Sequence, residues 1–304
     1  MSAEVWSHPT PAQWVAGARP RTLPAAVSPV LAGSGVAAFF GGFDVLGAAL
    51  ALVVSLALQV GVNYANDYSD GIRGTDSPGA GRVGPVRLVG QDLANPTDVR
   101  LAAFVAFFLA GLWGFALVAL SEAWVMLPIG ALCVVAAWYY TGGRRPYGYS
   151  GLGEVFVFVF FGLVATLGTL HTQADTLTLV GVLGAVGVGA LASAVLVANN
   201  LRDIPSDAEA GKRTLAVRLG DRGTRVLYAG LVAVSVVVVV ACALLGSWFA
   251  LLALPAYAFL WPALTALRSG AVGRDLIPVL ARTGQFQLGW SVLLAVGLAH
   301  HHHL

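Results

Sequence analysis

The sequence predicts an all-α integral membrane protein with nine transmembrane helices, and three observations support this fold class. Of the 304 residues, 58% are hydrophobic and only 11% are charged, whereas a soluble domain has about 25% charged residues. Long stretches carry no charge, and a membrane-spanning helix needs about 20 such residues, mostly apolar. The basic residues are confined to alternate segments between these stretches.

Eight charge-free runs define the predicted helices. They are residues 22–43, 45–66, 101–121, 123–143, 155–174, 176–201, 226–267 and 283–299. As a single helix, the run 226–267 would be about 63 Å long, twice the thickness of a hydrocarbon core of about 30 Å. It must fold back, and Gly246-Ser247 is the predicted turn, which gives nine helices. Pro24 and Pro29 are expected to kink the first helix.

The basic side chains predict the orientation of the bundle. With the N-terminus inside, all 17 Lys and Arg residues fall in the inner segments, which are 1–21, 67–100, 144–154, 202–225 and 268–282. The outer turns contain only Asp44, Glu122 and Asp175. Lys and Arg concentrate in cytoplasmic loops, so we expect a cytoplasmic N-terminus and an outer C-terminus. Two inner loops are long and polar, which places recognition or chemistry on the cytoplasmic face.

We expect residues 1–299 to form a single membrane-embedded domain. The His-rich tail 300–304 is either a tag remnant or native, and we expect no site residue in it. Cys133 and Cys242 each lie in an apolar run, which is typical of small buried core residues.

A cluster of amides and carboxylates ends the second predicted helix. In GVNYANDYSDGIRGTD, residues 61–76, the side chains of Asn63, Asn66, Asp67 and Asp70 are spaced i, i+3, i+4 and i+7. On a helix with 3.6 residues per turn, these four side chains share one face. The cluster lies at the predicted cytoplasmic end of its helix.

A second cluster of the same kind ends the sixth predicted helix. Asn200, Asp203 and Asp207 are spaced i, i+3 and i+7, and they share a face if the helix continues through Pro205. Both clusters have the same predicted depth. Each is followed by basic residues, which are Arg73, Arg82 and Arg87 after the first and Lys212 and Arg213 after the second.

The chemistry of these clusters follows from their charge. Facing Asp side chains repel each other unless a cation lies between them. Mg²⁺ suits such oxygen ligands and readily shares phosphate oxygens, while Lys and Arg bind the remaining phosphate charge. Within a bundle of apolar helices, the sequence therefore predicts a site for a lipid diphosphate whose tail lies among the helices. Metal and Arg would stabilise a departing pyrophosphate.

Other interpretations remain open. Charged residues just beyond membrane helices are commonly solvated caps. A transporter binds coupling cations with acidic residues, although here the acids lie at helix ends rather than at mid-membrane. A CDP-alcohol phosphotransferase is also membranous and Asp-rich, but its DGxxAR pattern is not matched at Asp70-Gly71. The glycine pairs lack the GxGxxG spacing of a nucleotide-binding fold, and no nucleic-acid partner is expected.

The two clusters carry a family resemblance. NDYSDGIRGTD and NNLRDIPSDAEAGKRTLAVRLG resemble the two Asp-rich motifs of the UbiA superfamily of intramembrane prenyltransferases. Further segments are similar to its branch that acts on 1,4-dihydroxy-2-naphthoate, above all to actinobacterial members, and they are residues 17–33, 82–89 and 140–162. The resemblance spans residues 13–222. The family motif NDxxDxxxD is not fully matched, because position 74 is Gly and the third acid is Asp76, whose metal role is left unassigned.

The resemblance implies nine helices around a central cavity, embedded in the lipid of the cell membrane, with the motifs on the cytoplasmic side. It also implies a reaction, in which a polyprenyl diphosphate held by Mg²⁺ loses pyrophosphate to give an allylic cation. The ring of 1,4-dihydroxy-2-naphthoate attacks this cation and loses CO₂, giving a demethylmenaquinol of menaquinone biosynthesis. Within the superfamily, 4-hydroxybenzoate or haem remains the alternative acceptor.

The resemblance implies roles for individual side chains as well. The implied metal ligands are Asp67, Asp70, Asp203 and Asp207. The amides expected to orient metal or phosphate are Asn63, Asn66, Asn199 and Asn200. The residues expected to contact phosphate or the acceptor carboxylate are Arg82, Arg87, Arg145 and Lys212.

Several residues near the inner helix ends have two interpretations. Arg19 and Arg21 contact either an anionic substrate or the membrane interface. Four tyrosines lie near the inner end of the fourth helix, and they are Tyr139, Tyr140, Tyr147 and Tyr149. They either form an interfacial belt or shield the allylic cation and stack on the naphthoate, and Tyr149 is expected to act in catalysis. Glu154 precedes a helix and is expected to cap it.

Overall fold

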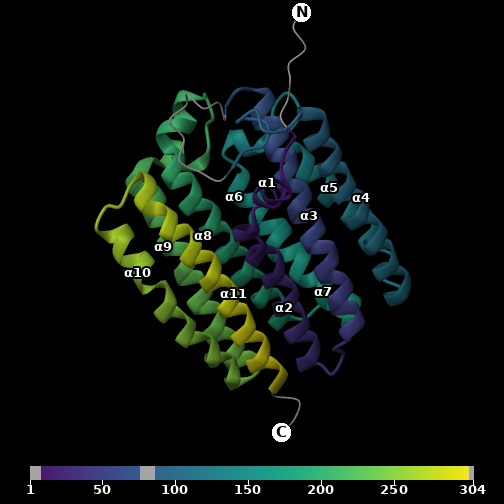
Figure 1. The fold of residues 1–304 in the computed structure, drawn as a ribbon. Helices are drawn as coiled ribbons and strands as arrows, with labels where there is room; N and C mark the ends of the chain where they lie inside the picture. Colours follow the sequence, from purple (N-terminus) through teal and green to yellow (C-terminus); the bar gives the residue numbers. More distant parts are fainter. Residues whose placement is uncertain (1–7, 76–85, 301–304) are drawn as a thin grey trace, which may run out of the picture.

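The computed structural model describes residues 8–75 and 86–300, and these residues form helices without any β-strand. Figure 1 shows the α-helices, which are α1 (Pro11–Gly17), α2 (Leu23–Phe39), α3 (Val45–Ile72), α4 (Pro96–Ser121), α5 (Met126–Tyr139), α6 (Gly153–Val157), α7 (Ala165–Ala174), α8 (Leu179–Glu209), α9 (Leu215–Leu245), α10 (Tyr257–Arg268) and α11 (Ile277–His300). Shorter 3₁₀ or π segments are η1 (Pro20–Thr22), η2 (Tyr147–Ser150), η3 (Phe158–Val164), η4 (Trp248–Ala256) and η5 (Gly273–Leu276).

Seven helical segments of the described chain are long and apolar enough to cross a membrane. They are Pro11–Phe39, Val45–Ile72, Pro96–Ser121, Gly153–Ala174, Leu179–Glu209, Leu215–Leu245 and Trp248–Arg268. The two other predicted runs form α5, with only 14 residues, and α11, with 24. The predicted fold-back at Gly246-Ser247 is confirmed, because α9 ends at Leu245 and the Ser247 hydroxyl caps η4 by accepting the Phe249 N–H.

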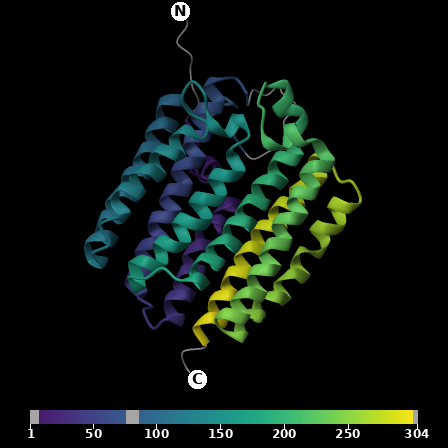
Figure 2. The ribbon, with the colours of Figure 1, turned by 180° about the vertical axis from the view of Figure 1, so that it is seen from behind.

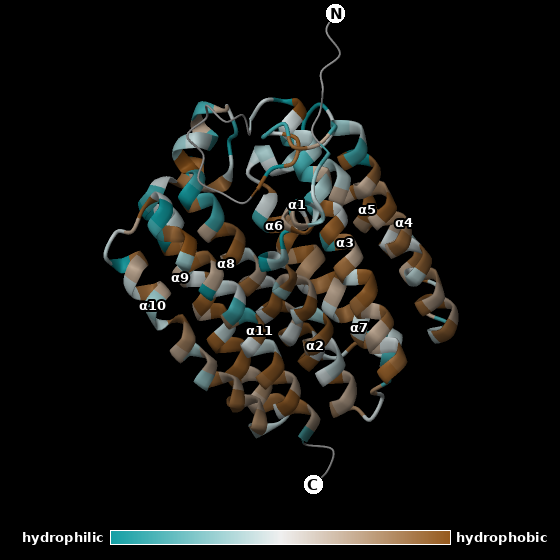
Figure 3. Cartoon of the chain, viewed as in Figure 1, coloured by the Kyte–Doolittle hydropathy of each residue, from teal (hydrophilic) through white to brown (hydrophobic). Residues whose placement is uncertain are grey.

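The helices lie side by side, with α4 and α5 on one flank and α9 and α10 on the other, as two opposite views show (Figures 1 and 2). Within this bundle α3 packs on α4, α8 on α9, and α11 on α2. The connections 86–95, 140–152 and 210–214 gather at one end, the upper end in Figure 1. This end is the most hydrophilic part of the molecule, and the helices below it are largely apolar (Figure 3).

Both polar clusters extend their helices beyond the apolar runs into this hydrophilic end. α3 continues to Ile72, and α8 continues through Pro205 to Glu209, so each cluster lies on a single helix. At the opposite end of the bundle, side-chain caps begin these two helices. Asp44 accepts the N–H groups of Leu46 and Gly47 at the start of α3, and Thr178 accepts the N–H of Gly181 at the start of α8.

Close packing of α11 against η4 depends on one glycine. A Cβ at Gly297 would lie 2.1 Å from the carbonyl oxygen of Phe249, whereas a Cβ at Gly289 would have no atom within 4 Å. We expect Gly297→Ala to lower the free energy of unfolding by about 1–3 kcal/mol, because the backbone of η4 must move. Gly289→Ala on the same helix is the control and should be neutral or slightly stabilising. Thermal unfolding in detergent measures both, and equal losses would contradict this packing.

Candidate active site

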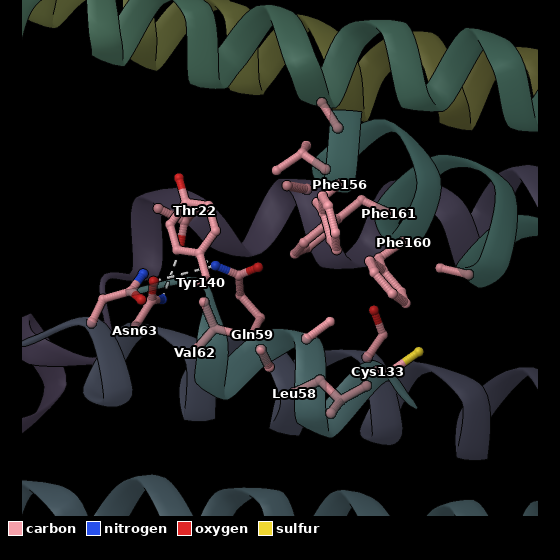
Figure 4. A pocket seen from close by; sticks show the side chains of 18 of the residues that line it. Thr22, Leu58, Gln59, Val62, Asn63, Cys133, Tyr140, Phe156, Phe160 and Phe161 are labelled. Carbon is pink, nitrogen blue, oxygen red and sulfur yellow. Dashed lines mark hydrogen bonds between the residues drawn. The ribbon is translucent and has the colours of Figure 1, made fainter. Parts of the chain in front are cut away.

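A cavity of about 1030 Å³ extends from the hydrophilic end into the bundle. Helices α2, α3, α4, α5, α7 and α8 contribute to its walls, together with the loops at the hydrophilic end. Its inner part is apolar, and Figure 4 shows Phe156 and Phe160 on one side of the space with Leu58 and Val62 opposite. The cavity therefore joins a charged end to an apolar chamber.

Asp70 of α3 lies where the positive charges converge. Its Oδ1 is 3.4 Å from the Lys212 ammonium, and its Oδ2 is 3.8 Å from Nη2 of Arg87. The hydroxyl of Tyr149 donates to Asp70 as well. All of these side chains line the cavity, and Asp70 is only 4% exposed. A buried carboxylate is tolerated when it is paired in this way.

Tyr149 combines a hydroxyl donor with an aromatic surface. The Lys212 ammonium lies 4.5 Å from the centre of its ring, and the Arg73 guanidinium lies 5.5 Å from it. Burial raises the pKa of the Tyr149 hydroxyl well above its usual range, and the neighbouring Asp70 carboxylate raises this pKa further. The hydroxyl therefore keeps its proton at neutral pH and acts as a donor. Arg73 also fixes the loop by donating to the carbonyl oxygens of Thr141 and Gly143.

The second cluster contains a guanidinium that sequence reasoning missed. Arg202 donates from Nε and Nη2 to the two oxygens of Asp203, both at 2.7 Å, and from Nη2 to Oδ1 of Asn199 at 2.9 Å. Arg202 is 7% exposed and lines the cavity with Asp203, Asp207 and Asn199. Its position immediately before Asp203 in the motif NNLRDIPSD was the available signal.

The amides of the first cluster connect elements around the cavity. Asn63 Nδ2 donates to the carbonyl of Ala18 at 2.8 Å and to the hydroxyl of Thr22 at 3.0 Å. Gln59, one turn earlier and not predicted, donates to the same Thr22 hydroxyl (Figure 4). Asn66 accepts from the Thr141 hydroxyl at 2.8 Å. These bonds hold α3 against the start of α2 and the loop after α5.

Asn200 is held by a buried acid. Its Nδ2 donates to Oε1 of Glu154 at 2.9 Å, and Asn200 lines the cavity whereas Glu154 does not. Glu154 lies in the first turn of α6, as the cap prediction requires, but the residue is only 6% exposed and its carboxylate contacts Asn200 of α8. A carboxylate only accepts hydrogen bonds, so it fixes which side of the Asn200 amide faces it.

Asp67 is the exception among the predicted carboxylates. It is fully buried but does not line the cavity. Its Oδ2 accepts the N–H of Leu88 at 2.8 Å, and its Oδ1 accepts the N–H of Val89 at 3.1 Å. The i, i+3, i+4, i+7 spacing therefore placed Asp67 on the correct side of α3, but the structure turns it toward a loop.

The other predicted residues divide between the cavity and the surface. Arg19, Arg21 and Tyr140 line the cavity. Arg145 is exposed and Tyr139 is 51% exposed, and the structure brings neither to the cavity. Of the two adjacent tyrosines at the end of α5, Tyr140 faces the cavity and Tyr139 does not, because adjacent helical side chains point about 100° apart. The loop then turns at Gly143 and Pro146, so that Tyr147 and Tyr149 face the cavity and Arg145 faces outward.

Arg82 and Asp76 lie outside the described residues. Among the aromatic residues that line the cavity, sequence reasoning overlooked Phe115, Phe156, Phe160 and Phe161. The i, i+4 spacing of Phe156 and Phe160 was the available signal for a shared helical face.

The donor set suits a hard cation that takes few protein ligands. Asp70, Asp203 and Asp207 reach the cavity from two helices, and Asn66 and Asn199 add amide oxygens. Within residues 8–75 and 86–300, no group of three His, Cys, Asp or Glu side chains lies close enough together to coordinate one metal ion. Mg²⁺ fits such an arrangement, because it uses one or two carboxylates and completes its shell with water and phosphate oxygens.

Sequence comparison places the chain among known prenyltransferases. A model of the UbiA prenyltransferase family matches residues 26–277. The chain is 54% identical to the 1,4-dihydroxy-2-naphthoate octaprenyltransferase of Mycobacterium tuberculosis over 288 residues, which are 95% of this chain and 97% of that protein. It is 39% identical to the enzyme of the same name from Escherichia coli, over 94% of each chain.

Solved structures of UbiA homologs share this fold. A UbiA homolog from Archaeoglobus fulgidus, bound to GPP and Mg²⁺, matches with a TM-score of 0.70 at 15% identity, over 95% of this chain and 99% of that one. The apo structure of a UbiA homolog from Aeropyrum pernix matches with a TM-score of 0.67 at 15% identity, over 90% and 96%. The family predicted from the two Asp-rich motifs is thus confirmed, and this chain belongs to the UbiA prenyltransferase family.

Proposed function

We propose that the chain transfers a polyprenyl group from polyprenyl diphosphate to 1,4-dihydroxy-2-naphthoate, with loss of CO₂ and pyrophosphate, in menaquinone biosynthesis. Relatives at 54% and 39% identity bear the name 1,4-dihydroxy-2-naphthoate octaprenyltransferase. The structural observation that carries the proposal is the continuity of the cavity, in which acidic and basic side chains open onto an apolar chamber. A lipid diphosphate has this same division between a charged head and an apolar tail.

The charged end binds the diphosphate. Lys212, Arg87 and Arg19 line it and supply positive charge, and Arg and Lys are the side chains that phosphate recognition uses. Asp70, Asp203 and Asp207 would hold Mg²⁺, which would supply positive charge to stabilise the leaving pyrophosphate. Tyr149 orients Asp70 by donating to it, so the carboxylate keeps its place among the cations.

The bond changes are those of an aromatic substitution. The allylic C–O bond breaks, and its electron pair leaves with pyrophosphate. The ring carbon that carries the carboxyl group forms the new C–C bond, and CO₂ departs while its bonding pair stays in the ring. Phe156, Phe160, Tyr140 and Tyr147 present aromatic surface to the cavity. Such surface stabilises the allylic cation and excludes water that would trap it.

The identity of the acceptor is tested in membranes with radiolabelled farnesyl diphosphate and a panel of aromatic acids, with and without Mg²⁺. We expect 1,4-dihydroxy-2-naphthoate to be consumed with release of CO₂, and only when Mg²⁺ is present. Consumption of 4-hydroxybenzoate instead would identify a different acceptor within the same family.

We also propose nine membrane crossings in one domain of residues 1–299, with the charged end of the cavity facing the cytoplasm of a cell membrane. The distribution of all 17 basic residues supports this orientation, and α5 and α11 would complete the seven longer apolar segments. In a cell membrane, the apolar chamber can receive a lipid substrate directly from the bilayer.

The orientation is tested by thiol labelling of intact cells. Asp175, whose side chain is 93% exposed, and Glu209, which is exposed at the other end of α8, are each replaced by Cys. We expect Asp175→Cys to react with an impermeant reagent from outside, and Glu209→Cys to react only after permeabilisation. External labelling at position 209 would reverse the proposed orientation.

The metal site is tested by neutralising one carboxylate on each helix. Asp70→Asn and Asp207→Asn should each slow prenyl transfer by at least about 100-fold, as expected when one charge-stabilising group is lost. Asp98→Asn, an exposed acid at the same end of the bundle, should retain activity. Transfer that persists in EDTA would rule out the Mg²⁺ mechanism.

The diphosphate contacts are tested by comparing two basic residues from neighbouring loops. Lys212 lines the cavity, whereas Arg145 is exposed. Lys212→Ala should weaken binding of a non-reactive thio-diphosphate analogue about 10- to 150-fold, since a charged hydrogen bond contributes about 1.5–3 kcal/mol. Arg145→Ala should leave that affinity unchanged. Equal effects of the two substitutions would show that net charge, rather than the cavity contact, attracts the substrate.

A further inference from the structure

The Asp-rich motif of α3 contains two acids with different partners, and we propose that Asp67 is a positioning residue rather than a metal ligand. It fastens the backbone of residues 88–89 to α3 and so holds Arg87 beside Asp70. The inference rests on the proposed function only in assigning Arg87 to diphosphate binding. The contact between Asp67 and the loop is independent of that assignment.

The geometry at Asp67 is that of an anchor. Each carboxylate oxygen accepts one backbone N–H, Oδ2 from Leu88 at 2.8 Å and Oδ1 from Val89 at 3.1 Å. Hydrogen bonds to an ionised carboxylate are stronger than those between neutral groups, and here two lie in consecutive peptide units. Asp67 is fully buried and takes no part in the cavity wall, where a cation shared with a substrate phosphate has to lie.

Residues 88–94 form a compact loop that packs closely against α3 near Asp67. Leu88 is fully buried and Val89 is 5% exposed. The carbonyl of Leu88 accepts the N–H groups of Leu93 and Ala94 at 2.9 and 3.0 Å, which closes residues 88–94 into a compact turn. A Cβ at Gly71 would lie 2.4 Å from Cγ1 of Val89, so glycine at this position lets the loop approach α3 closely.

The turn sets the position of a cavity residue. Arg87 immediately precedes the anchored peptides, lines the cavity and places Nη2 3.8 Å from Oδ2 of Asp70. Asp67 and Asp70 are three residues apart on α3, so one helix holds the loop backbone with the first acid and meets the loop side chain with the second. Release of the backbone would let Arg87 leave the charged end of the cavity.

The chemistry of Asn makes the test specific. Asp67→Asn keeps the size of the side chain but offers one carbonyl oxygen and one NH₂ group, so one of the two loop N–H groups loses its acceptor. Leu88→Cys supplies a buried thiol as a reporter of the loop. Labelling at position 88 is followed by mass spectrometry, which separates it from Cys133 and Cys242.

We expect Asp67→Asn to raise the labelling rate at position 88 at least about 10-fold, the scale of one lost hydrogen bond to a charged group. Asp70→Asn is the matched control on the same helix and should leave this rate unchanged. The Mg²⁺ requirement should show the reverse pattern. Asp70→Asn should raise the Mg²⁺ concentration needed for half-maximal transfer, and Asp67→Asn should leave it unchanged. If Asp67→Asn does not accumulate, Asp67→Glu, which displaces both acceptors by one methylene, replaces it in the same comparison.

A second readout asks whether Asp67 acts through Arg87. Asp67→Asn and Arg87→Ala should each raise the KM for prenyl diphosphate, and the double variant should be no worse than Arg87→Ala alone. Unchanged labelling at position 88, additive losses in the double variant, or a rise in the Mg²⁺ requirement of Asp67→Asn would each overturn the proposal. Absence of prenyl transfer in the unsubstituted protein would instead count against the proposed function, since the labelling comparison needs no activity.

Discussion

A carboxylate buried among apolar helices has to be paired, and this requirement organises the charged end of the molecule. An uncompensated buried charge costs several kcal/mol, so each acid in a membrane bundle recruits a partner. Asp70 is met by Lys212 and Tyr149, which come from two different loops. Asp203 is met by Arg202 of its own helix through two bonds of 2.7 Å. The loops that carry Tyr149 and Lys212 are therefore connected to α3 by hydrogen bonds and charge.

The same pairing makes the cavity suitable for its proposed substrate. Both cationic and acidic side chains line the charged end, so a diphosphate can meet the cations while a divalent cation meets the carboxylates. Below them the walls are aromatic and aliphatic, and the low dielectric strengthens the electrostatic contacts above. The π-helical segment η3 lies in this wall and carries Phe160 and Phe161 into the cavity. Such segments are frequent at functional sites because they re-aim side chains within a continuous helix.

Much of this could be predicted from the sequence, because membrane helices and polar clusters leave strong one-dimensional patterns. The charge-free runs located the helices and the fold-back at Gly246-Ser247. The spacing of the polar clusters placed Asp70, Asp203 and Asp207 in one cavity. Loop geometry left no comparable signal. The outward turn of Arg145 depends on how residues 143–149 close back on α5. The length of α5 was also overestimated, because a lack of charge does not show where a helix begins or ends.

The difference between Asp67 and Asp70 shows the limit of the helical-face argument. Residues three apart on an α-helix are separated by about 60° around its axis, so a stripe of four polar side chains is wide enough to meet two surroundings. Asp70 meets Lys212 across the cavity, whereas Asp67 meets the loop that carries Arg87. The sequence pattern indicates only that both acids face away from lipid. A metal ligand and a residue that holds a loop both meet this requirement, so the pattern does not distinguish them. The donors separate the two acids, because Asp70 is met by side chains, whereas Asp67 is met by backbone N–H groups that any sequence contains.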